Sequence, residues 1–138
     1  MKQIPDTKDS LVLRTDFSDA ATWDLICAEI RIPVGEFQVY VDCISDPEYD
    51  GLTTGRVRSL IPEGYNHSFI FIVDHIAVSH PEHPIIVVDL YDQVGRTFRV
   101  IPREMWSIEN NLSLANMDFA EFADSVDQDG IFRGFRES

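Results

Sequence analysis

The sequence predicts a single α+β domain in which helices pack on a mixed, five-stranded sheet. Two segments, 68–74 and 84–91, are apolar on both faces, which is typical of strands inside a covered sheet. A third segment, 96–101, alternates apolar and polar residues and indicates a half-buried strand. The chain has 138 residues, 44% of them hydrophobic, so it is the size of one domain and has material for a core.

The first elements are predicted to be a strand and a helix. Residues 1–9 are expected to form a flexible N-terminal segment, and the strand runs over 11–17. Ser18 is a good N-cap residue, which places Asp19 in the first helical turn, where the helix dipole favours negative charge. The apolar side of this helix recurs at helical spacing and consists of Trp23, Ile26, Cys27 and Ile30.

A second strand is predicted over 36–43, where apolar and polar residues alternate so that one face is buried. An acidic loop rich in turn-forming residues follows over 46–51. A short helix over 54–61 then presents an apolar side to the sheet.

The remaining strands are predicted to form an antiparallel meander. The loop 75–83 is too short for a full crossover helix, so the strands 68–74 and 84–91 are expected to be antiparallel. The loop 92–96 contains a glycine and is expected to close a hairpin to the strand 96–101.

Two helices are predicted to complete the domain, over 102–112 and 118–126. Asp118 is expected as the N-cap of the second, with Glu121 three residues later in a capping-box arrangement. Residues 127–135 return to extended or turn structure. The predicted order of elements is therefore β-α-β-α-β-β-β-α-α.

The formal net charge of −13 restricts the classes of partner. Binding to nucleic acid or to anionic membranes is not expected, because both require a basic surface. A basic protein partner is compatible with this charge, although the charge alternatively serves only solubility. The sequence has no run of about 18 apolar residues and no signal-peptide core, so a cytoplasmic location is expected.

Cys27 and Cys43 are the two cysteines of the chain, and their spacing matches no metal-binding or redox motif. Both fall on predicted apolar faces. They are therefore expected to be buried free thiols that pack as small hydrophobic side chains.

The weak candidates for catalysis are acids at strand ends, together with a nearby arginine, Arg14. Asp16, Asp74 and Asp89 each lie near the end of a predicted strand, where loops commonly carry binding groups. Three converging carboxylates could hold Mg²⁺ or Ca²⁺. Because the strands are not all parallel, each acid is instead expected to pair with an arginine or to cap a backbone amide, and no metal or cofactor is predicted.

His67 precedes the first central strand and is the histidine best placed for acid–base chemistry. Its neighbour Ser68 is a poor nucleophile for it, because adjacent side chains of an extended chain point to opposite faces. The same reasoning applies to Asp74 and His75. Neither pair predicts a catalytic dyad.

Several blocks of the sequence are distinctive, namely LVLRTDFS at 11–18, PEGYNHSF at 62–69, VVDLYD at 87–92, TFRVIP at 97–102 and ANMDF at 115–119. Together they resemble a bacterial domain family of unknown function, of about this length. The resemblance covers most of the chain and implies a small, single-domain bacterial protein. It implies no activity, ligand or catalytic residue.

The favoured hypothesis is an acidic, non-enzymatic interaction module, of inhibitor or immunity type, that covers a basic site on a partner protein. Its interface is predicted from two acidic groups and from exposed aromatic rings, including Tyr40, that could anchor it. The residues assigned to this interface are Asp42, Asp46, Glu48, Tyr49, Asp50, Asp118, Glu121 and Asp124.

Two other functions stay open. A small-molecule-binding protein or hydrolase would gather its polar groups in one pocket. Those groups are Arg14, Asp16, His67, Asp74, Asn110 and Asn111. A structural homo-oligomer would instead pair through an open edge at the strand 36–43 or 96–101. The absence of a catalytic motif favours a protein that is not an enzyme, although the sequence does not decide the question.

Overall fold

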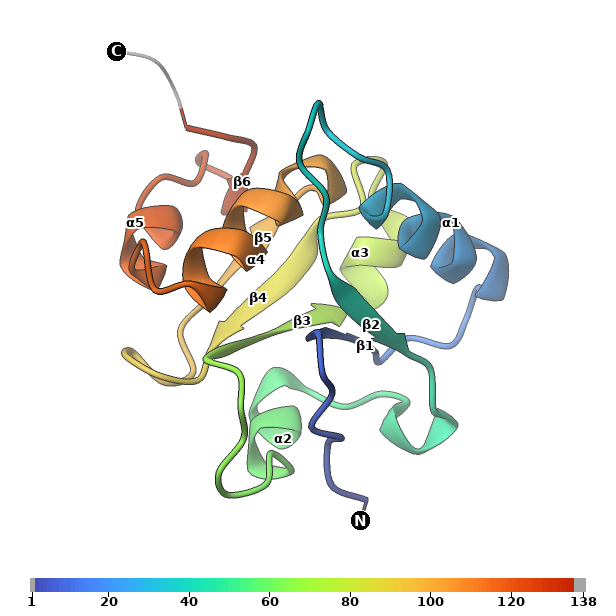
Figure 1. The fold of residues 1–138 in the computed structure, drawn as a ribbon. Coiled ribbons are helices and arrows are strands. Elements are labelled where there is room, and N and C mark those ends of the chain that lie inside the picture. Colours follow the sequence, from blue (N-terminus) through green and yellow to red (C-terminus); the bar gives the residue numbers. More distant parts are fainter. Residues whose placement is uncertain (1, 136–138) are drawn as a thin grey trace.

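The protein is built on one six-stranded sheet with helices on both faces (Figure 1). The computed structural model describes residues 2–135. In spatial order the strands are β2 (Val41–Ile44), β1 (Ser10–Arg14), β3 (Phe69–Val73), β4 (Ile85–Asp89), β5 (Thr97–Val100) and β6 (Ile131–Phe132). β1 is parallel to both of its neighbours, β4 is antiparallel to both of its own, and β6 is parallel to β5.

The helices divide between the two faces of the sheet (Figure 1). One face is covered by α1 (Ala20–Ile30), α3 (His75–Ser79), α4 (Met105–Ser113) and α5 (Phe119–Ala123), and the other by α2 (Thr54–Ser59). Two short 3₁₀ turns, η1 (Pro47–Tyr49) and η2 (Pro102–Glu104), complete the described elements. No helix in residues 2–135 is long and apolar enough to cross a membrane.

The central strands are apolar on both faces because each face borders its own core. Along β3, Phe69, Phe71 and Val73 belong to the core under α1, α4 and α5. Ile70 and Ile72 point the other way and pack in the core under α2. The α+β class and the mixed sheet predicted from these segments are thereby confirmed.

The direction of β4 determines which loops meet. It runs against the other five strands. We call the side where β1, β2 and β3 begin and β4 ends the amino edge of the sheet, and the opposite side the carboxyl edge. Asp89, at the end of β4, therefore lies at the amino edge, whereas Asp16 and Asp74, which follow β1 and β3, lie at the carboxyl edge.

The sheet has one more strand than predicted. The segment 127–135 contains β6, which pairs with β5 through Arg99 and Ile131. The strand at 97–100 is therefore not an open edge of the sheet, contrary to the expectation. β2 is left as the edge strand on its side.

The helix α1 begins one residue later than predicted. Asp19, not Ser18, is its N-cap: the Asp19 carboxylate accepts hydrogen bonds from the Thr22 amide at 3.0 Å and the Thr22 hydroxyl at 2.6 Å. The Ser18 hydroxyl is already donated to Asp16 Oδ1, at 2.5 Å. A carboxylate one residue further along therefore supplies the acceptor that the first helical turn requires.

The second strand is shorter than predicted. Residues 36–40 do not pair with β1, and Phe37, expected on the buried face, is 51% exposed. Its ring instead stacks on Trp106 of α4, with ring centroids 4.1 Å apart. The aromatic contact thus draws this stretch of chain away from the sheet and toward α4.

The N-terminal segment makes contacts with the body of the domain. Ile4 is buried, and its amide donates to the Leu60 carbonyl oxygen at 2.9 Å. The Tyr49 hydroxyl donates to the Gln3 carbonyl oxygen at 2.6 Å. Met1 lies outside the described residues, and residues 2–9 form a strip beside α2 that leads into β1.

Candidate functional site

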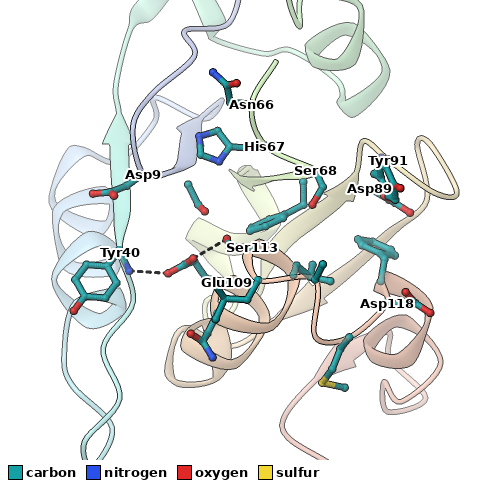
Figure 2. A pocket seen from close by; sticks show the side chains of 18 of the residues that line it. Asp9, Tyr40, Asn66, His67, Ser68, Asp89, Tyr91, Glu109, Ser113 and Asp118 are labelled. Carbon is teal, nitrogen blue, oxygen red and sulfur yellow. Dashed lines mark hydrogen bonds between the residues drawn. The ribbon is translucent and has the colours of Figure 1, made fainter. Parts of the chain in front are cut away.

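A groove of about 980 Å³ opens at the amino edge of the sheet (Figure 2). We call it the amino-edge groove. Its walls come from the start of β1, the segment before β3, the turn after β4, and α4 with the turn that follows it. The residues that line it include Lys8, Asp9, Tyr40, His67, Asp89, Tyr91, Asp92, Glu109, Leu114 and Asp118.

Glu109 is one of two buried acids of the groove wall, only 8% exposed. Its Oε1 accepts a hydrogen bond from the Tyr40 amide at 3.1 Å, and its Oε2 accepts one from the Ser113 hydroxyl at 2.8 Å (Figure 2). Ser113 lies one helical turn further along α4, which brings the two side chains onto one face. Both partners are neutral, so they satisfy the carboxylate without cancelling its charge.

Asp89 is held in the same way. It is 2% exposed, and its carboxylate accepts hydrogen bonds from the backbone amides of the turn after β4, those of Tyr91, Asp92 and Gln93, at 2.9, 3.2 and 2.8 Å. This arrangement caps the turn that closes the β4–β5 hairpin. Asp89 therefore has the capping role that the sequence favoured over metal binding.

Negative charge dominates the groove. Five lining side chains are carboxylates, those of Asp9, Asp89, Asp92, Glu109 and Asp118, against a single lysine, Lys8. None of the five acids forms an ion pair with another described residue. A concave surface lined by one sign of charge focuses the field and raises the local concentration of cations.

Exposed apolar side chains stand beside these acids. Tyr91 is 80% exposed and Tyr40 is 62% exposed, and the side chain of Leu114 on the turn after α4 is similarly open. Aromatic rings at such positions offer contact area and a face that attracts cations. The groove therefore combines negative charge with apolar contact surface.

His67 lines the groove but already has a structural partner. Its Nε2 lies 2.6 Å from the Thr7 carbonyl oxygen, and because a carbonyl only accepts, this nitrogen carries the proton. The ring also makes an edge contact with Tyr65, at 5.5 Å between centroids. His67 thus fastens the N-terminal strip to the segment that enters β3.

The carboxyl edge carries a smaller hollow of about 500 Å³, which is lined by Asp16, Asp74 and His75 among others. Asp16 Oδ2 lies 2.8 Å from His75 Nδ1. The pKa of Asp16 is lowered, chiefly by the hydrogen bond from the Ser18 hydroxyl and further by His75. This pairing joins the ends of two parallel strands, β1 and β3, and the sequence does not reveal it because 59 positions separate the two residues.

Asp74 is engaged with Arg99. The guanidinium donates to both carboxylate oxygens, at 2.9 and 2.7 Å, while Oδ1 also accepts from the Ala77 amide and caps α3. Burial alone would raise the pKa of Asp74, but the hydrogen bonds from Arg99 and Ala77 outweigh it, so the pKa is lowered. The expected pairing of this acid with an arginine is confirmed.

Arg14 is buried beneath the same edge. Its Nε donates to the Asp16 carbonyl oxygen at 3.0 Å, and its NH1 to the Ser45 hydroxyl at 3.2 Å. The guanidinium lies 4.2 Å from the centroid of the Phe17 ring. These contacts commit Arg14 to holding the loops beyond β1 and β2.

The six polar residues expected in one pocket are therefore divided. His67 and Asn110 line the amino-edge groove, Asp16 and Asp74 line the carboxyl-edge hollow, and Arg14 is buried. Asn111 donates to the Ser107 carbonyl oxygen within α4. Among residues 2–135, no group of three or more histidine, cysteine, aspartate or glutamate side chains is placed to hold a metal ion.

The acids assigned to a protein interface fall into two separate regions. Asp42, Asp46, Glu48 and Asp50 lie in and after the edge strand β2, whereas Asp118, Glu121 and Asp124 lie at α5 on the far side of the sheet (Figure 1). Several of them have local partners: Asp46 binds Lys2, Asp124 binds Arg96, and Glu121 accepts from the Asp118 amide. Of this set, Asp118 also lines the amino-edge groove.

Tyr49 is not the exposed anchor that the sequence suggested. Its side chain is completely buried in the core under α2. The ring lies there because η1 turns the acidic loop back on the domain, and the hydroxyl finds the Gln3 carbonyl oxygen. An aromatic residue between exposed acids was misread as a surface residue.

Glu109 could have been identified from the sequence. Met105, Ile108 and Leu112 set the apolar side of α4, and position 109, four residues after Met105, falls on that side. A carboxylate there requires buried partners. The groove itself required tertiary structure, because its walls come from segments up to about a hundred residues apart.

Fold and groove together define a small α+β domain with a concave, acidic surface at the amino edge of its sheet. The chain belongs to the family described as Domain of unknown function (DUF6924), whose model matches residues 9–135. This assignment confirms the resemblance drawn from the sequence blocks. None of the curated proteins compared with the chain is significantly similar to it.

Proposed function

We propose that this protein is a non-enzymatic interaction module whose amino-edge groove binds a basic segment of a partner protein. The observation that carries the proposal is the groove lining, with five carboxylates against one lysine beside exposed tyrosine rings. The module acts as an inhibitor or immunity-type protein when the segment that it covers belongs to the active site or binding site of the partner.

Electrostatics and contact area support this choice of partner. Lysine and arginine side chains would meet carboxylates that accept hydrogen bonds from neutral groups and keep their negative charge, as at Glu109 and Asp89. The rings of Tyr40 and Tyr91 could receive an arginine or a hydrophobic side chain. Complementary charge also speeds the encounter, so the association rate is expected to fall steeply as salt rises.

The proposal relocates the interface predicted from the sequence. Of the acids assigned to that interface, Asp118 lines the groove, where it is gathered with Asp9, Asp92 and Glu109. We place the interaction in the cytoplasm of a bacterium, as the sequence suggested. There both thiols of the protein would stay reduced under ordinary conditions.

The test is capture of partners from a lysate of the source organism at low and at high salt. Two exposed acids allow a matched comparison: Asp92→Lys reverses a charge in the groove, and Asp50→Lys makes the same reversal at a distance from it. We expect wild type and Asp50→Lys to retain the same basic partner at low salt and Asp92→Lys to lose it. Absence of a basic partner at low salt, or equal capture by all three proteins, would contradict the proposal.

A second candidate function rests on the pair formed by Asp16 and His75. The His75 side chain is 74% exposed and its Nδ1 is bound to a carboxylate, which is the arrangement that orients an imidazole for general-base chemistry. Hydrolysis of a chromogenic ester would test it. A rate that is reduced in His75→Gln, but unchanged in the Asp92→Lys variant, would favour this hydrolase over the interaction module.

A third candidate is a homo-oligomer formed through β2, which remains at the edge of the sheet. Sedimentation of the purified chain separates it from the other two. A monomer at all accessible concentrations would remove it.

A further inference from the structure

We propose that Cys27 and Cys43 are the two halves of a reversible disulfide site, which a peroxide oxidises and which then fastens α1 to the edge strand β2. The site is separate from the amino-edge groove, and this inference does not depend on the proposed function. It concerns two residues that the sequence predicted to be inert thiols of the core.

The two thiols meet across the junction of α1 with the sheet. Cys27 lies on the inner side of α1, between Trp23 and Ile30, and packs in the core on that face. Cys43 pairs in the sheet with Val12 of β1, and its side chain packs against the same core. The Cys27 and Cys43 side chains face the same core and interact, each being the largest influence on the pKa of the other. A disulfide between them requires the two sulfurs to approach to about 2.05 Å.

Arg31 makes the two cysteines unequal. It follows the last turn of α1, its NH1 lies 3.5 Å from the Cys27 carbonyl oxygen, and its positive charge also acts on the Cys43 thiol. The hydrogen bond from Cys27 and the charge of Arg31 lower the pKa of Cys43, against the opposing effects of burial and of Asp42. The same hydrogen bond to Cys43, together with burial, raises the pKa of Cys27, so Cys27 holds its proton.

Exposure follows the same order. Cys43 is half-buried, which differs from the full burial predicted for it, while Cys27 is buried. A thiolate that is partly accessible and lies beside an arginine is the reactive member of such a pair. Cys27 is then the resolving thiol, already in contact with the sulfur that it must attack.

The chemistry balances with a peroxide as the oxidant. The Cys43 thiolate attacks one oxygen of hydrogen peroxide, the O–O bond breaks, and the proton taken up by the leaving hydroxide yields water and Cys43 sulfenic acid. The Cys27 sulfur then attacks the sulfenic sulfur, the S–O bond breaks, and a second water leaves with the proton from Cys27. The two thiols have lost two electrons and two protons in total, and a dithiol reductant reverses the reaction.

In a cytoplasmic protein, a disulfide that forms reversibly is expected more than a permanent one. Disulfides in a reducing compartment are mostly transient and sense oxidants. Here the bond would close a loop that includes the turn at residues 33–40 and the approach to β2. It would therefore restrain the edge strand and the adjoining chain that carries Tyr40.

The test is brief exposure of the purified chain to hydrogen peroxide. We expect the intact mass to fall by two hydrogen atoms, peptide mapping to link Cys27 with Cys43, and dithiothreitol to restore the original mass. Because the bond closes a loop of about 15 residues, Tm should rise by about 10 °C on oxidation. Free thiols that persist until the protein unfolds, or disulfide-linked dimers in place of the internal link, would overturn the proposal.

Three variants test the assignment of roles without requiring the disulfide. Cys27→Ser should accumulate sulfenic acid at Cys43, which dimedone traps, whereas Cys43→Ser should give no trapped adduct at Cys27. Arg31→Gln should slow the reaction of Cys43 with peroxide. Equal trapping at either cysteine, or an unchanged rate in Arg31→Gln, would contradict the assigned roles, and circular dichroism of each variant checks that it is folded.

Discussion

At the carboxyl edge of the sheet the acids are bonded to side chains that carry or can take up a positive charge, whereas at the amino edge Glu109 and Asp89 are bonded to neutral donors. Asp74 pairs with Arg99 and Asp16 with His75 at the first edge. Glu109 and Asp89 are held by amides and a hydroxyl at the second. A carboxylate bonded to neutral groups keeps its full charge, so the attraction for a cationic ligand remains at the amino edge.

This difference in bonding partners predicts that the acids of the carboxyl edge contribute to stability and those of the amino edge to recognition. Acids paired with cations join elements of the fold, and their removal should be seen in the free energy of unfolding. Acids held by neutral donors present an unbalanced charge to the groove, and their neutralisation should be seen in binding. Substitutions at the two edges therefore test whether the acids of each edge have these separate roles.

The largest effect on stability is expected at Arg99. Changing Arg99→Met leaves Asp74 partly buried without its cation and should lower the free energy of unfolding by about 2–3 kcal/mol. Urea denaturation measures it. The exposed Arg103 offers a control, since Arg103→Met should change stability by no more than about 0.5 kcal/mol. Equal effects at the two arginines would contradict the importance of the pair.

Glu109 should give the next largest effect and should separate its two roles. Glu109→Ala removes the acceptor of the Tyr40 amide and of the Ser113 hydroxyl, and should cost about 2 kcal/mol of stability. Glu109→Gln keeps both hydrogen bonds possible, so it should retain most of the stability while weakening the binding of a basic peptide. Loss of stability without loss of binding in Glu109→Gln would assign Glu109 to the fold alone.

The carboxyl edge should contribute to the pH dependence of stability. The pKa values of Asp16 and Asp74 are lowered from 3.8 in the folded protein, so their contribution is present above the unfolded pKa and is lost as the pH falls through the folded values. Asp74→Asn should therefore flatten the stability curve below about pH 4. Asp92→Asn at the groove serves as the comparison. A curve equally flattened by Asp92→Asn would show that the acids of the two edges are not distinct.

The smallest effect on stability is expected at Tyr91. Its ring is almost fully exposed, so Tyr91→Ala should leave the free energy of unfolding within about 0.5 kcal/mol of the wild-type value. Calorimetric titration with a basic peptide should nevertheless show weaker binding, because the ring offers contact area in the groove. Unchanged affinity would remove Tyr91 from the interface.

The sheet could be predicted from sequence because its signals are local. The strands β3 and β4 are runs of apolar residues, and the short loop between them requires antiparallel pairing. The sequence pattern gave wrong predictions where tertiary contacts determine the local structure. Phe37 stacks on Trp106 and does not continue the strand β2. The two residues of β6 form a strand because they pair with β5.

The candidate site was harder to predict because its residues meet only in the folded chain. The capping and pairing roles of Asp89 and Asp74 followed from the strand directions that the sequence indicated. The pair of Asp16 with His75 did not, since 59 positions separate them and parallel pairing of β1 with β3 unites them. The position of Tyr49 and the contact between the two cysteines likewise depend on how distant segments pack.

The most direct test of the contrast between the edges is amide NMR of the labelled protein during titration with a short peptide of alternating lysine and leucine residues. We expect salt-sensitive shifts at the amino-edge groove, in residues 8–10, 66–69, 91–92 and 109–119. Amides around Asp16 and Asp74 should stay unchanged. Shifts centred on the carboxyl edge, or spread evenly over all the exposed acids, would contradict the account.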